Sequence, residues 1–139
     1  MLDCVKKAWA DYSDNLNNLT GFYTYKDLFS VAVEKVLNAY LDENNNALDD
    51  DYYLFDGLDI ENITEIDNGN YQGTIIFIIP YKGGSPDISQ YLCTYVEYGS
   101  CSACDSLEAA YSLKGKEKQK ALKQICLNLL QNLDFLRRS

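Results

Sequence analysis

The sequence predicts an α+β fold, in which a small antiparallel sheet of about three strands packs with N-terminal helices and two C-terminal helices. Apolar residues recur at helical spacing near both ends of the chain, whereas three strand-like runs (58–66, 71–79 and 90–98) lie together in the middle. Helices followed by strands and then by further helices are typical of the α+β class. A length of 139 residues predicts a single domain over residues 1–139.

Two helices are expected before the sheet. Residues 3–15 place Val5, Ala8, Trp9 and Tyr12 near one face of a short helix. Residues 25–41 form a stronger helix, because its apolar positions repeat at helical spacing; they are Leu28, Phe29, Ala32, Val36, Leu37 and Tyr40. A polar, acidic loop is expected over residues 42–51.

The first two strands are expected to form a hairpin. Asp67–Asn70 separates them and contains Asn68-Gly69, and Asn-Gly is the strongest short hairpin signal because a type I′ turn needs positive φ at both central positions. The second strand contains five consecutive apolar residues, Ile75–Ile79, which predict a central strand buried on both faces. Pro80 ends that strand.

Two helices are expected after the sheet. Ser102 and Asp105 fit the capping-box pattern, so a helix is expected to begin near Ala103 and to end near Gly115, a fitting C′ residue. Residues 117–136 are expected to form a long final helix. Its apolar stripe consists of Ala121, Leu122, Ile125, Cys126, Leu129, Leu130 and Leu133.

Composition excludes several classes of function. The chain contains no histidine, which removes Ser-His and Cys-His catalysis and histidine-based zinc chemistry. We therefore expect no enzymatic activity and no cofactor. The N-terminus has no apolar signal region, and the longest apolar run, Ile75–Pro80, is too short to cross a bilayer. These features predict a cytoplasmic protein that does not bind membranes.

Charge is unevenly distributed along the chain, whose net charge is −9. Ten acidic residues and no Lys or Arg lie between Val36 and Tyr81, whereas seven basic residues lie between Lys114 and Arg138. The acidic block would repel nucleic acid but could imitate it toward a basic protein surface. The alternative is a solvated acidic face that a basic helix partly neutralises. The predicted partner-binding residues are Asp42, Glu43, Asp49, Asp50, Asp51, Tyr52, Tyr53, Asp56 and Asp59.

Cys101 and Cys104 form a Cys-x-x-Cys pair where the third strand meets the next helix. A helix N-terminus lowers the pKa of a thiol, which favours redox chemistry, but no proline follows Pro86 to face a disulfide, as a thioredoxin-like fold would require. A zinc site would need Cys93 and Cys126 as further ligands, and these are isolated residues in a strand and on an apolar helix face. Packing of both thiols at a structural corner is the third interpretation.

Two stretches resemble proteins of a known context. Ile66–Pro80 (IDNGNYQGTIIFIIP) and Thr94–Ala109 (TYVEYGSCSACDSLEA) are similar to small uncharacterised proteins of tailed bacteriophages and prophages. Those proteins share an Asp-x-Gly-x-Tyr-Gln-Gly-Thr hairpin and a Tyr-Gly-Ser-Cys-Ser-x-Cys-Asp-x-Leu corner. The match covers about residues 56–136, and it implies an accessory protein made during infection rather than any particular chemistry.

Together these features predict a non-enzymatic phage protein that binds and inhibits a host protein. By analogy with anti-restriction and anti-CRISPR proteins, the host protein would act in defence or handle nucleic acid. The acidic, tyrosine-rich segment would contact its basic surface, without direct binding of nucleic acid by this chain. Two alternatives stay open: a thiol or metal site at Cys101 and Cys104, and sequestration of a small signalling nucleotide in a pocket.

Overall fold

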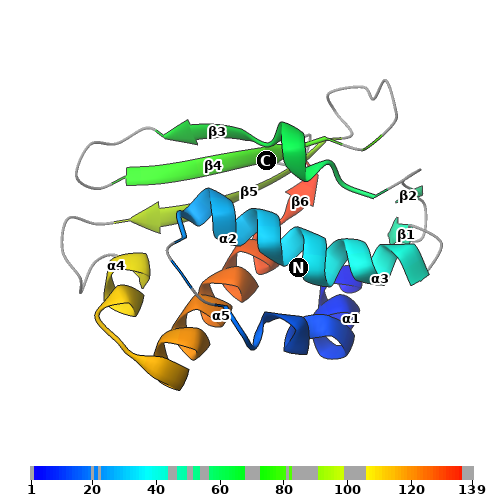
Figure 1. Cartoon of the computed structure of the whole chain (residues 1–139). Helices are drawn as coiled ribbons and strands as arrows, with labels where there is room; N and C mark the ends of the chain where they lie inside the picture. The colour runs from blue at the N-terminus through cyan, green and yellow to red at the C-terminus, as the bar shows by residue number, and fades with distance from the viewer. Residues whose placement is uncertain are drawn as a thin grey trace.

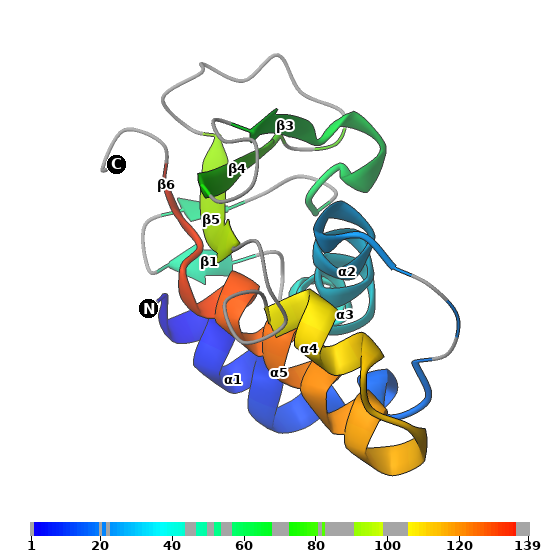
Figure 2. The same ribbon diagram turned by 90° about the vertical axis from the view of Figure 1, so that its left-hand side faces the viewer.

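The computed structural model describes residues 2–19, 21, 23–43, 47–49, 52–53, 57–67, 73–80, 82, 91–98 and 106–135, with the backbone alone for 47–49, 52–53 and 106. The predicted α+β class is confirmed: helices cover one face of an antiparallel sheet (Figures 1 and 2). Buried side chains from Leu2 to Phe135 form one hydrophobic core between these layers. The prediction of a single domain stays a prediction.

The two predicted N-terminal helices are present. α1 (Asp3–Tyr12) continues into the 3₁₀ turn η1 (Ser13–Leu16). The second helix runs without a break through α2 (Tyr25–Ala32), the π-helical turn η2 (Val33–Leu37) and α3 (Asn38–Glu43). It begins where a capping box fixes its first turn: Thr24 Oγ1 accepts from the Asp27 N–H, and Asp27 Oδ2 accepts from the Thr24 N–H.

In the described part of the chain, the main sheet contains four strands in the order β3-β4-β5-β6. The four are β3 (Thr64–Asp67), β4 (Gly73–Ile79), β5 (Leu92–Tyr98) and β6 (Asp134–Phe135). Every neighbouring pair is antiparallel. β4 lies between two other strands, so the prediction of a central strand is confirmed.

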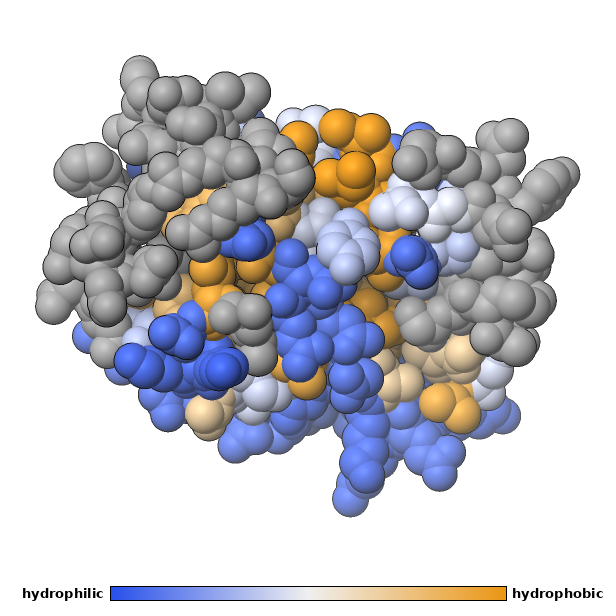
Figure 3. All heavy atoms as spheres, turned by 180° about the vertical axis from the view of Figure 1, so that it is seen from behind, coloured by the Kyte–Doolittle hydropathy of each residue, from blue (hydrophilic) through white to orange (hydrophobic). Residues whose placement is uncertain are grey.

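Burial of β4 on both faces, however, is wrong. Ile75, Phe77 and Ile79 point toward the helices and are buried, whereas Ile76 and Ile78 on the opposite face are only half-buried. The cross-strand neighbours of Ile76 are Ile66 and Tyr95, which are 45% and 47% exposed. Seen from behind, the molecule shows an apolar area bordered by hydrophilic side chains (Figure 3). The continuous apolar run therefore indicated a strand with a neighbour on each side, but it did not indicate that both faces of the strand are buried.

The predicted hairpin exists, but the register of its strands differs from the expected turn. Asp67 pairs with Ile75, whereas a two-residue Asn68-Gly69 loop would pair Asp67 with Asn70. The connecting residues lie outside the described part of the chain. The first predicted strand, 58–66, is also shorter than expected, because its start forms the 3₁₀ turn η3 (Ile60–Asn62).

The C-terminal region contains α4 (Ser106–Tyr111) and α5 (Gly115–Gln131). α4 ends four residues before Gly115, which has φ +60 at the start of α5 and is not the C′ residue of α4. The last helix is also shorter than predicted. It ends at Gln131 because the chain then pairs as β6 with the open edge of β5, through Leu92–Phe135 and Cys93–Asp134.

Aromatic and hydroxyl side chains join the layers. The rings of Phe29 on α2 and Phe77 on β4 stack with their centroids 5.5 Å apart. The buried Thr94 hydroxyl on β5 donates to the Leu129 carbonyl of α5 at 2.5 Å. Tyr25 Oη accepts from the Leu107 N–H, and Tyr111 Oη donates to the Tyr23 carbonyl, so that α4 is attached to the start of α2.

The segment that leads into the sheet is attached to α3 by Asn38. Its Nδ2 donates to the Leu58 carbonyl and its Oδ1 accepts from the Leu58 N–H, both at 2.9 Å. Gly57 beside it has φ +83, and a Cβ there would lie 3.0 Å from Asn38 Oδ1. Only glycine meets both conditions without strain. Asp59 N–H donates to the Pro80 carbonyl, which ties the same segment to the end of β4.

We expect Asn38→Ala to lower the free energy of unfolding by about 2–4 kcal/mol, because both backbone groups of the buried Leu58 lose their partner. Urea denaturation measures this. Asn15→Ala is the matched control, since Asn15 makes one exposed hydrogen bond to the Lys35 carbonyl and should cost about 1 kcal/mol or less. Equal costs for the two variants would show that Asn38 does not hold the segment.

Candidate functional site

The structure places the predicted acidic residues in two groups. Asp42 and Glu43 form the last turn of α3 and are exposed. Tyr12 donates its hydroxyl proton to Glu43 Oε2, and this hydrogen bond, together with burial and nearby carboxylates, raises the pKa of Tyr12 to about 12. The contact attaches the end of α3 to the end of α1, so this acidic turn has a fixed position.

A short hairpin follows α3 where the sequence predicted only a loop. β1 (Ala47–Asp49) and β2 (Tyr52–Tyr53) pair in antiparallel fashion, with Asp49 opposite Tyr52 and Ala47 opposite Tyr53. The hairpin lies beside the end of α3 (Figure 1). Of the other predicted residues, Asp50, Asp51 and Asp56 lie outside the described residues.

The second group surrounds η3. Asp59 caps this turn: Oδ1 accepts from the Glu61 N–H at 3.1 Å, and Oδ2 accepts from Asn62 Nδ2 at 2.6 Å. The Asp59 carboxylate is therefore oriented; the residue as a whole is half-buried, whereas Glu61 is exposed. An aspartate whose oxygens are both held in this way contributes a fixed negative charge.

These carboxylates border a groove that the sequence did not indicate. The groove has a volume of about 550 Å³ and is lined by Glu34, Asn38, Asp59, Ile60, Glu61 and Lys82. Three carboxylates and one lysine give it an excess of negative charge. Asp42 lies one helical turn beyond Asn38, on the same side of α3. We call Glu34, Asp42, Asp59 and Glu61 the acidic face.

Sequence reasoning missed Glu34, Asn38 and Lys82. The spacing of Glu34, Asn38 and Asp42 is four residues each time, which is the spacing of one polar stripe opposite the apolar stripe of the same helix. That signal was available. The sequence did not indicate that residues 57–61 lie beside this stripe. Their position depends on the two hydrogen bonds between Asn38 and Leu58, which are twenty residues apart.

Part of the acidic block and the lysine-bearing start of α5 lie at different ends of the molecule. The end of α3 and the β1–β2 hairpin lie at one end, whereas α4 and the lysine-bearing start of α5 lie at the other (Figure 1). A view from the side agrees, since α4 and the start of α5 face the viewer there (Figure 2). The acidic turn that ends α3 is therefore separated from the lysines at the start of α5.

Two of the four thiols in the zinc hypothesis cannot meet. Cys93 pairs with Ile78 and Asp134, so it lies on the sheet face opposite the helices. Cys126 lies in the core on α5, where its Sγ donates to the Leu28 carbonyl at 3.6 Å. No cluster of three or more potential metal ligands occurs among the described residues. Cys101 and Cys104 lie outside them, so their role stays a prediction.

Comparisons with protein-family models, with curated proteins and with solved structures gave no significant match. In the described part of the chain, no helix has the length and apolar character needed to cross a membrane.

Burial raises the pKa of the Cys126 thiol to about 12. The unfolded chain, with its thiol pKa near 9.0, loses this proton first, so the contribution to stability is present below pH 9 and declines as the pH rises toward 12. We expect the unfolding free energy of the wild type to fall more steeply than that of Cys126→Ala, by up to about 1.4 kcal/mol per pH unit. Parallel pH profiles in urea denaturation would contradict this interpretation.

Proposed function

We propose that this protein is a non-enzymatic accessory protein of a bacteriophage or prophage that binds and inhibits a host protein in the cytoplasm of the infected cell. The acidic face is the contact surface, and the partner presents a basic surface of the kind that normally binds nucleic acid. The observation that carries the proposal is the groove of about 550 Å³ in which Glu34, Asp59 and Glu61 gather around Asn38.

The geometry supports binding rather than a solvated charge run in two ways. The Asp59 carboxylate is held by Glu61 N–H and Asn62 Nδ2, and the Asn38 amide is held by both backbone groups of Leu58. Groups that are already ordered lose little conformational entropy when a partner binds. A concave arrangement of fixed carboxylates also concentrates the field that attracts a cationic surface and steers its approach.

Five of the described tyrosines have a role different from the partner contact that the sequence suggested. Tyr12, Tyr98 and Tyr111 each donate a hydroxyl hydrogen bond within the molecule, to Glu43, Asp67 and the Tyr23 carbonyl. Tyr25 and Tyr40 are buried. The proposed contact surface therefore rests on carboxylates, and a contribution from Tyr52 and Tyr53 stays a prediction.

Charge reversal on the acidic face should abolish capture of the partner. We expect Glu34→Lys with Glu61→Lys to weaken binding at least ~10-fold, because lysines would face the partner's basic groups across the interface. Both side chains are exposed, so the fold should survive, which circular dichroism checks. The measurement is affinity capture from a lysate of the bacterial host, with the captured protein identified by mass spectrometry.

The matched control is Glu97→Lys with Glu117→Lys, which changes the net charge by the same amount at exposed positions on β5 and α5. The control should retain the partner captured by the wild type, and the captured protein should lose activity when the wild type is added. Retention of the partner by the Glu34 and Glu61 variant would exclude the acidic face as the contact surface. Loss in both variants would mean that only net charge matters.

A further inference from the structure

A second groove lies at the basic end of the molecule. It has a volume of about 410 Å³ and is lined by Asn17, Asn18, Lys116, Gln119, Lys120 and Lys123. One wall is the first half of α5, and the other is the chain that leaves η1. The volume is within the range of small-molecule sites, about 300–1,000 Å³. All six lining residues carry amide or ammonium groups, so the groove offers hydrogen-bond donors and positive charge.

The three lysines share one side of α5. Lys116, Lys120 and Lys123 are spaced by four and three residues, which places them one above the other along the helix. From Lys116 to Lys123 the helix rises roughly 10 Å. The row begins in the first turn of a 17-residue helix, where the exposed backbone N–H groups add positive potential. Such a row is longer than one phosphate group and suits a chain of linked phosphates.

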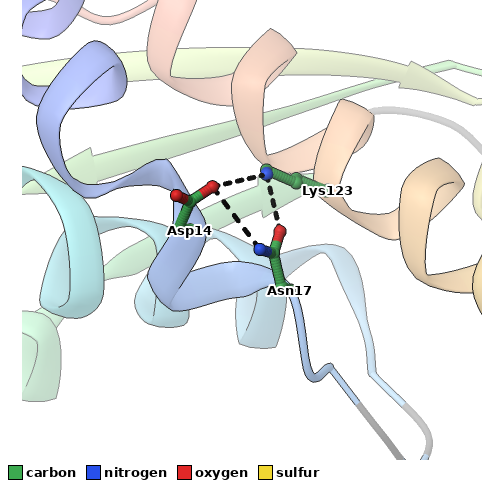
Figure 4. A network of polar contacts seen from close by, with 3 residues as sticks. All are labelled: Asp14, Asn17 and Lys123. Carbon is green, nitrogen blue, oxygen red and sulfur yellow. Dashed lines mark hydrogen bonds and ion pairs between the residues drawn. The ribbon is translucent and has the colours of Figure 1, made fainter.

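One of these ammonium groups is held in place. Lys123 Nζ donates to Asn17 Oδ1 at 2.7 Å and lies 3.8 Å from Asp14 Oδ1, and Asn17 Nδ2 donates to the same Asp14 oxygen at 3.4 Å (Figure 4). The Lys123 side chain is only 25% exposed, whereas that of Asp14 is 91% exposed. The Asp14 carboxylate offsets one positive charge, and three lysines against one carboxylate leave the groove cationic.

The rest of the basic region is arranged differently. Lys118 points to the other side of α5, where its ammonium lies 4.9 Å from the centre of the Tyr111 ring. Lys116, Lys120 and Lys123 therefore lie together on the groove side of α5, whereas Lys118 does not. Lysine binds phosphate as a compact point charge, and amide side chains such as Asn18 and Gln119 can donate to the remaining oxygens.

We propose that this groove binds a small polyphosphate anion, such as the phosphate chain of a nucleoside polyphosphate. Recognition is through the phosphates, because the described residues that line the groove are lysines and amides, with no aromatic ring among them to stack on a base. The site lies apart from the acidic face and does not depend on the proposed partner. Binding of the anion would involve Lys116 and Lys120 directly, with Lys123 and Asn17 forming the prepared end of the groove.

Isothermal titration calorimetry of the full chain with inorganic tripolyphosphate at low salt tests this proposal. We expect saturable binding of one tripolyphosphate per chain. Lys116→Gln with Lys120→Gln should weaken it at least ~10-fold, since each variant position loses a charged contact. The control, Lys6→Gln with Lys7→Gln, removes two exposed charges from α1, outside the groove, and should bind as the wild type does.

Two further arms identify the source of the phosphates. ATP should bind with an affinity similar to that of tripolyphosphate, because the described lining residues include no aromatic ring to stack on the base. A single-stranded oligonucleotide should bind more weakly, and tighter binding of the oligonucleotide through the same two lysines would overturn the proposal in favour of a nucleic-acid surface. The absence of saturable tripolyphosphate binding, or equal loss in both double variants, would also overturn it.

Discussion

The two hydrogen bonds between the Asn38 carboxamide and the backbone of Leu58 are the contact on which the arrangement of the molecule depends. They join the long helix, Tyr25–Glu43, to the segment that enters the sheet. Without them, the buried N–H and C=O of Leu58 would lack partners, and the desolvation of these two groups would lower the free energy of unfolding. The requirement for glycine at position 57 follows from the same contact, since a Cβ would press on Asn38 Oδ1.

The same contact also creates the acidic face. Residues 57–61 bring Asp59 and Glu61 to the stripe of α2–α3 that contains Glu34 and Asp42, and none of these four carboxylates adjoins another in sequence. The π-helical turn η2 lies within this stretch, and π-helical turns are frequent at functional sites because they shift the direction of the side chains that follow. A structural amide thus determines where the negative charge gathers.

Tyrosine hydroxyls act as a second set of ties. The Tyr98 hydroxyl donates to Asp67 Oδ1 at 2.7 Å across the sheet, and Tyr12 connects α1 to Glu43. Tyr12 and Tyr98 therefore connect separate elements through their hydroxyl groups, while their rings are partly buried against the core.

The sequence predicted the elements that have a strong apolar period. The helix from Tyr25 and the strands ending at Ile79 and Tyr98 were found because their apolar positions repeat over many residues. β6 was missed because Leu133 and Leu136 continue the helical spacing of α5 in the sequence, and only the open edge of β5 turns Asp134 and Phe135 into a strand. The β1–β2 hairpin was missed because three acidic residues in five dominate its pattern.

The candidate site was predicted in part, and for a related reason. Local charge identified Asp42 and Asp59, but Glu34 stands outside the acidic block and joins it only in three dimensions. The sequence showed that the region with Lys116, Lys120 and Lys123 is basic, but it did not identify these three lysines as a groove. Its opposite wall, Asn17 and Asn18, is about a hundred residues away in sequence, and no local pattern connects the two. The sequence could not predict which segments, far apart along the chain, lie side by side in the folded molecule.

The most direct test of the account is to map which carboxylates touch a partner. A carbodiimide in the lysate of the bacterial host joins carboxylates to lysine amines in contact with them, and mass spectrometry identifies the linked residues. If the acidic face is the contact surface, Glu34, Asp42 or Glu61 will be linked to lysines of one host protein. Links from Glu97 and Glu117 with none from the acidic face would contradict it.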